Sequence, residues 1–70
     1  MIRYSDHAQR QMAKRRITED DVSQALHQQV NTTPGDPGSV WIHGYTRGGR
    51  ILKVCVDIHD KEFVITVAWP

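Results

Sequence analysis

The chain has 70 residues and a formal charge of +1, from nine Lys and Arg against eight Asp and Glu. A chain this short cannot bury two separate cores, so residues 1–70 are expected to form a single domain. Its balanced charge lacks the electrostatic footprint of a general nucleic-acid-binding protein. The one cysteine, Cys55, excludes an internal disulfide and a cysteine-rich zinc cage, and we expect it to be a small apolar strand residue.

The first predicted element is a short helix. Ser5 or Asp6 can cap its free amides, so the helix begins there and ends near Arg15. In such a helix His7, Gln11 and Arg15 are successive i, i+4 neighbours and form one polar stripe. An imidazole and a guanidinium on one rigid face can serve phosphate chemistry without a metal. The same pair can equally act as a hydrogen-bonded brace.

A second helix follows after a joint at residues 16–17. It opens with Thr-Glu-Asp-Asp at residues 18–21, a variant of the capping box with three acids in the first turn, where the helix dipole favours them. Val22, Ala25 and Leu26 recur at i, i+3 and i+4, which gives this helix one buried face.

Residues 31–39 contain Pro-Gly twice, at 34–35 and at 37–38, and these are strong turn signals. No helix crosses them. We therefore expect either a loop or an irregular edge strand that leads into the sheet.

From Val40 onward the hydrophobic period changes to two, which predicts three strands at residues 40–46, 50–58 and 63–69. The turns between them are predicted at Gly48-Gly49 and at Asp60-Lys61.

The hydrophobic pattern also predicts the register of the hairpins. In the second hairpin the apolar face pairs Val54 with Val67 and Val56 with Ile65, and the other face pairs Cys55 with Thr66. In the first hairpin two registers stay open. A two-residue turn puts Trp41, His43 and Tyr45 on the core face, whereas a bulged three-residue turn puts Val40, Ile42 and Gly44 there.

The apolar sheet face needs a cover, and the two helices are the only candidates. The predicted fold is therefore α+β with the order ααβββ. Both helices pack on one face of a three-stranded antiparallel sheet, or a four-stranded one if residues 31–39 join it. Four aromatic residues are expected in the core, without the interleaved basic residues of a platform for single-stranded RNA: Trp41, Tyr45, Phe63 and Trp69.

These landmarks resemble a bacterial family described only as a domain of unknown function, number 4258. The matching stretches are His7-Ala8, Met12, Arg15, Ile17, Thr18 to Leu26, Gly49 to Val56 and Val64 to Val67. Two positions depart from the family pattern, since Gln11 stands where members often carry arginine and Arg16 where glycine is common. The family is similar in layout to RelE/ParE-type and BrnT-like toxins, several of which are metal-free ribonucleases. The resemblance implies a toxin of the nuclease type.

Metal-free RNA cleavage needs a base, an acid and cations that stabilise the phosphorane charge. The candidate catalytic residues are His7 as acid or base, Arg15 and Arg50 as phosphate ligands, and Thr66. The candidate substrate-binding residues are Gln11, Tyr45 and Lys53. No metal or other cofactor is expected, because the four histidines are widely spaced and no Cys-x-x-Cys pair exists.

The leading hypothesis is a RelE/ParE-like toxin that acts on RNA as a metal-independent endoribonuclease. The alternative is a non-catalytic interaction module, either a homodimer or the partner of an antitoxin-like protein, which would pair through an exposed last strand. No signal peptide and no apolar run near the ~20 residues of a membrane span is present, so we expect a cytoplasmic protein without a membrane partner.

Overall fold

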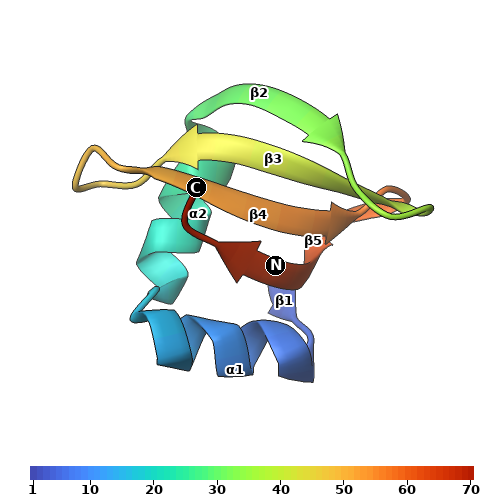
Figure 1. Cartoon of the computed structure of the whole chain (residues 1–70), viewed down its shortest axis with the longest axis horizontal. Helices are drawn as coiled ribbons and strands as arrows, with labels where there is room; N and C mark the ends of the chain where they lie inside the picture. Colours follow the sequence, from blue (N-terminus) through green and yellow to red (C-terminus); the bar gives the residue numbers. More distant parts are fainter.

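The computed structural model describes residues 1–70 as two helices and one five-stranded sheet (Figure 1). The strands lie in the order β1-β5-β4-β3-β2, with β1 parallel to β5 and every other pair antiparallel. The α+β class is confirmed. The predicted order ααβββ with three or four strands is wrong, because two further strands form. In chain order the elements are β1 Arg3–Tyr4, α1 Asp6–Arg15, α2 Glu19–His27, β2 Gln29–Pro34, β3 Ser39–Tyr45, β4 Ile51–Asp57 and β5 Asp60–Ala68.

The two additional strands form by pairing with neighbours and have no apolar pattern of their own. β1 has two residues, and Arg3 lies beside Phe63 of β5. β2 reads Gln-Val-Asn-Thr-Thr-Pro and pairs with β3, with a register shift between Gln29 and Asn31. β1 pairs with Phe63 and Val64 of β5 and α1 lies along the same strand, so the last strand is not the open edge that the sequence led us to expect. The long free edge of the sheet is β2.

Both helices begin where their capping residues predict, and α1 ends at Arg15 as expected. The Ser5 hydroxyl accepts a hydrogen bond from the Ala8 amide at 2.9 Å, and the Thr18 hydroxyl accepts one from the Asp21 amide at 3.0 Å. The Asp21 carboxylate in turn accepts from the Thr18 amide, which completes the capping box. Arg16 ends α1 in the left-handed region at φ 57°, and the chain turns there into α2.

The first hairpin adopts the bulged three-residue turn. The Thr46 amide donates to the Arg50 carbonyl at 2.8 Å, and Gly49 takes a φ of 84° that favours glycine. This turn puts Val40, Ile42 and Gly44 on the core face. Trp41, His43 and Tyr45 therefore point to the opposite face of the sheet.

The second hairpin follows the predicted register over its first part only. Val54 lies opposite Val67 and Cys55 opposite Thr66, as expected, but Val56 lies opposite Val64 and not Ile65. An extra residue in β5 makes this bulge, and it brings Val64 onto the core face. The predicted turn at Asp60-Lys61 is wrong, because Asp57 pairs with Asp60 and the chain turns at residues 58–59.

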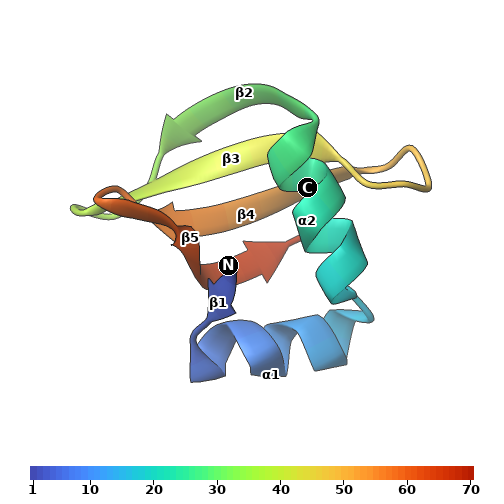
Figure 2. The same cartoon turned by 180° about the vertical axis from the view of Figure 1, so that it is seen from behind.

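The core lies between the helices and one face of the sheet. Helix α2 packs on β3 and β4, whereas α1 lies along β5 at the edge of the sheet (Figures 1 and 2). Cys55 is free and 5% exposed, as expected for an apolar strand residue. No helix has the length and apolar character needed to cross a membrane. The core consists of Ala8, Met12, Ile17, Val22, Ala25, Ile42, Leu52, Val54, Val56, Val64 and Val67.

The expectation that the four large aromatic residues lie in this core holds only in part, because Trp69 alone among them packs against it. Trp41, Phe63 and Trp69 are only partly buried, and Tyr45 is 41% exposed. Aliphatic side chains fill the space instead, because the close contact between α2 and β3 at Gly44 leaves no room there for a ring.

Candidate functional site

The sheet face that α2 does not cover carries polar and aromatic side chains, and we name it the open face. It is turned toward the viewer in Figure 1, where α2 lies behind the strands. Because neighbouring strands are in register, its side chains form two rows across the sheet. The first row is Thr33, Trp41, Cys55 and Thr66, and the second is Asn31, His43, Lys53 and Ala68.

A cation, an imidazole and an indole meet at the centre of the open face. The Lys53 ammonium lies 4.6 Å from the centre of the Trp41 ring, a cation–π contact. His43 lies directly across the strand pair from Lys53. The Nε2 atom of His43 is hydrogen-bonded to the Thr33 hydroxyl at 3.0 Å, which holds the imidazole in place. Lys53 has no carboxylate partner.

A hollow lies beside this centre. Trp41, Cys55 and Thr66 line its floor, and the loop from Pro34 to Ser39 forms one wall. Thr66, a predicted catalytic residue, therefore lies on the same face as Lys53, one row away. Tyr45, a predicted substrate-binding residue, lies at the end of β3 on this face.

The two flanks of helix α1 have different surroundings. Gln9 and Met12 share a hollow with Glu19 of α2. Helical geometry then puts His7, Gln11 and Arg15 on the other flank of α1, away from α2. We name these three residues the α1 flank.

Contacts along the α1 flank are local. The Arg15 Nε atom donates to the Gln11 side-chain oxygen at 2.9 Å. His7 is exposed and makes no hydrogen bond or ion pair. It lies eight residues before Arg15, about 12 Å away along the helix axis. The structure therefore joins Arg15 to Gln11 by a hydrogen bond, and the His7 ring bonds to neither of them.

Two predicted catalytic residues, Arg15 and Arg50, both contact Trp69 at the C-terminal end of α1. The Arg50 guanidinium lies 3.8 Å from the centre of the Trp69 ring. The indole Nε1 of Trp69 donates to the main-chain carbonyl of Arg15 at 3.2 Å. Trp69 thus ties the turn that carries Arg50 to the end of α1, and no carboxylate neutralises either guanidinium.

Asp20 and Asp60 form ion pairs with Arg47 and Arg3, whereas Asp36 and Asp57 line the hollow on the open face. The hydrogen bond from the Arg47 guanidinium lowers the pKa of Asp20, and the one from Arg3 lowers the pKa of Asp60. Burial, together with the Glu19 carboxylate, raises the pKa of Tyr4. No group of three or more His, Cys, Asp or Glu side chains gathers as a possible metal site.

Sequence reasoning missed His43 as a site candidate. It also missed that cations lie over the rings of three aromatic residues, Trp41, Trp69 and Phe63. The sequence feature that could have identified His43 is the turn of the first hairpin, because the type of turn decides on which face of the sheet His43 lies. Once Gly49 accepts a positive φ, the three-residue turn turns the side chain of His43 outward beside Lys53.

The fold and this face define a small α+β domain with one covered and one open sheet face. A family model described as "Domain of unknown function (DUF4258)" matches residues 4–69, so the chain belongs to that family. No curated protein and no protein of solved structure matches the chain.

Proposed function

We propose that this protein binds single-stranded RNA on its open face and cleaves it without a metal, as a cytoplasmic toxin of the RelE/ParE-like kind. The observation that carries the proposal is the position of Lys53. Its ammonium lies 4.6 Å over the Trp41 ring, opposite His43 and without a carboxylate partner. An unneutralised cation beside an aromatic ring suits the phosphate and the base of one nucleotide.

Binding would use groups on both sides of this centre. The rings of Trp41 and Tyr45 offer faces for bases, and stacking on them tolerates any base. Lys53 pairs with a phosphate, and an RNA strand that continues past the ends of β3 and β4 would reach the free guanidinium donors of Arg15 and Arg50 at the end of α1. A strand of several nucleotides therefore fits better than a mononucleotide.

Cleavage would proceed by attack of the neighbouring 2′-hydroxyl on the phosphate. His43 takes the proton from that hydroxyl, its oxygen bonds to phosphorus, and the bond from phosphorus to the 5′-oxygen breaks. The Lys53 ammonium stabilises the phosphorane charge and gives the leaving oxygen its proton. The Thr66 hydroxyl donates to a phosphate oxygen. The products are a 2′,3′-cyclic phosphate and a 5′-hydroxyl, so no external reactant is needed.

The test combines RNA binding with RNA cleavage. Fluorescence anisotropy with a labelled, unstructured RNA measures Kd at several salt concentrations, and a gel measures cleavage. We expect Lys53→Gln to weaken binding on the order of tenfold and to lower the salt dependence by about one phosphate contact. His43→Gln should keep most of the binding and abolish cleavage.

His59→Gln is the matched control, because His59 is an exposed residue in the turn between β4 and β5, away from Lys53. It should behave like the wild type in both assays. Failure of the wild-type chain to bind RNA at low salt would refute the proposal. Binding without cleavage would retain the interface and reject the catalytic step.

A second candidate function is a non-catalytic interaction module, as a homodimer or with an antitoxin-like partner. The observation in its favour is the free edge of β2, whose six residues include only one, Thr33, that is not exposed. A strand edge of this kind offers unpaired main-chain groups to another chain.

A further inference from the structure

We infer that the covered side of the sheet holds a docking site for an extended segment of a partner protein, which pairs with β2 and places an apolar side chain and a carboxylate in the pocket beside it. The inference rests on the interaction function given as the second candidate, and is independent of chemistry on the open face. Two separate features support it, the free edge of β2 and the pocket.

The free edge of β2 can accept another strand. β2 is the last strand of the sheet, and no element lies beyond it in either view (Figures 1 and 2). Its regular part, Asn31 to Thr33, follows a bulge and precedes Pro34. In an antiparallel pair only alternate residues bond to the neighbouring strand, so the others direct their N–H and C=O groups outward. β2 carries no charged residue that would repel a partner.

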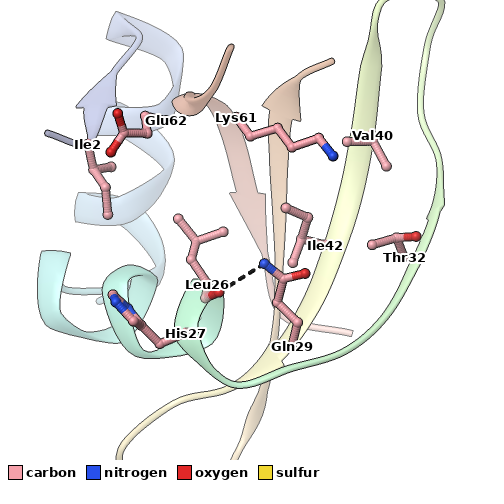
Figure 3. Close-up of a pocket in the computed structure, with 9 residues that line it drawn as sticks. All are labelled: Ile2, Leu26, His27, Gln29, Thr32, Val40, Ile42, Lys61 and Glu62. Carbon is pink, nitrogen blue, oxygen red and sulfur yellow. Dashed lines mark hydrogen bonds between the residues drawn. The ribbon is translucent and has the colours of Figure 1, made fainter. Parts of the chain in front are cut away.

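The pocket opens next to this edge on the helix side of the sheet (Figure 3). Leu26 of α2 and Ile42 of β3 lie at its centre, and Thr32 of β2 lies at its rim. The Gln29 amide donates to the Leu26 carbonyl at 2.9 Å, which fixes the corner between α2 and β2. An apolar side chain from a strand paired with β2 would point along Thr32 into this space. The full lining is Ile2, Leu26, His27, Gln29, Thr32, Val40, Ile42, Lys61 and Glu62.

The unpaired positive charge at the pocket indicates that the partner also carries a carboxylate. The Lys61 side chain reaches across the pocket toward Val40 (Figure 3), and its ammonium forms no ion pair or hydrogen bond. The neighbouring carboxylate of Glu62 contacts the amino group of Met1 instead, at 3.1 Å. A cation above an apolar floor favours a ligand that joins an apolar group to a carboxylate.

The geometry favours a glutamate in an extended chain. A strand added at β2 lies about 10 Å from β3, two strand spacings away. The Lys61 ammonium already lies beside Val40 of β3 (Figure 3), so the side chain of a glutamate on the added strand has to extend across β2 only. A second copy of this chain offers no such group, because its β2 contains no carboxylate. The partner is therefore a different protein segment, in which an apolar residue and a glutamate alternate with outward-facing residues.

The test selects peptides against the full chain. The probes are short displayed peptides in which threonine alternates with a randomised residue. We expect enrichment of sequences with an aliphatic residue two positions from a glutamate. For a selected peptide, Lys61→Glu should raise Kd on the order of tenfold, and replacing the peptide's glutamate by lysine should restore binding to this variant. NMR shift changes should cluster at β2 and at the end of α2.

Two variants separate the possible outcomes. Arg10→Glu makes the same charge change on the exposed side of α1 and should leave peptide binding unchanged. Thr32→Arg fills the rim of the pocket and should abolish peptide binding while RNA binding by the open face persists. If circular dichroism shows that this variant is unfolded, Thr32→Leu, whose larger side chain also fills the rim, serves in its place.

The inference is overturned if no acidic and apolar pattern is enriched, or if the selected peptides bind the Thr32→Arg variant equally well. It is also overturned if the wild-type chain sediments as a dimer that Thr32→Arg converts to a monomer. In that case a second copy covers the edge of β2.

Discussion

Gly44 of β3 lies directly against the main-chain carbonyl of Ala25 in α2. A Cβ atom added at Gly44 would overlap that oxygen, and the carbonyl carbon of Ala25 would lie at 2.7 Å. Both groups are backbone, so no side-chain rotation relieves the overlap. This contact sets how closely α2 approaches the sheet, and therefore which strands it covers.

Gly44→Ala should consequently destabilise the fold by about 3 kcal/mol, because α2 must move away from β3 and open the core. Urea unfolding followed by circular dichroism measures the change. Gly48→Ala is the control, since the nearest atom to its added Cβ is the Thr46 hydroxyl at 3.9 Å. Equal midpoints for the two variants would show that α2 does not depend on this contact.

Arg16→Gly should stabilise the protein by about 1 kcal/mol. Arg16 ends α1 at φ 57°, a conformation in which any residue with a Cβ is strained and glycine is not. The same substitution inside the helix, Lys14→Gly, should cost about 1 kcal/mol. Urea midpoints compare both with the wild type. A lower midpoint for Arg16→Gly would mean that the Arg16 side chain contributes more than its backbone strain costs.

The two tryptophans should respond differently to the same change. Trp69→Phe removes the hydrogen bond to the Arg15 carbonyl and should cost about 1 kcal/mol of stability. The Trp41 indole makes no such bond. Trp41→Phe should therefore leave the unfolding midpoint almost unchanged and affect RNA binding instead. Thermal unfolding and anisotropy on both variants distinguish these roles, and the reverse order of effects would contradict the assignment.

The ion pair of Asp20 with Arg47 should stabilise the fold above mildly acidic pH only. The hydrogen bond from Arg47 lowers the pKa of Asp20 below its ordinary 3.8 in the folded chain. The stabilisation is therefore fully present above the unfolded-state pKa and disappears as the pH falls through the lowered one. The difference in urea midpoint between wild type and Arg47→Gln should be constant near neutral pH and vanish in strong acid. Arg10→Gln should show no such pH dependence.

The roles of the two candidate catalytic histidines, His7 and His43, can be separated in cells. Sequence reasoning favours His7 as the acid or base, whereas the register of β3 and β4 favours His43 beside Lys53. Induced expression in a bacterial host, with growth and RNA integrity scored, should show that His43→Ala abolishes toxicity and RNA damage. His7→Ala should retain both. If His7→Ala alone abolishes them with the fold intact, the catalytic imidazole is on α1.

The sequence predicted the candidate site only in part, for reasons of geometry. The face of Lys53 and Thr66 follows from the alternation of side chains along a strand, whereas the face of Tyr45, like that of His43, depended on the turn of the first hairpin. The face of the sheet on which His43 lies depended on whether Gly49 adopts a positive φ. Both hairpin turns were compatible with the same amino-acid sequence. The meeting of Arg50 with the end of α1 depended on Trp69, which lies 54 residues from Arg15 in the chain.

Local interactions are what the sequence by itself determined about this protein. Both helices, their caps and the three apolar strands follow from capping hydrogen bonds and hydrophobic periodicity. These depend only on residues that are close together in the chain. Only the tertiary structure decided that β1 and β2 join the sheet, because their hydrogen bonds depend on partners rather than on a pattern of their own. The same holds for the bulge at Val64, the free edge of β2 and the pocket beside it. Each of these features arises where segments distant in the chain pack together. Local conformational preferences do not determine how distant segments pack.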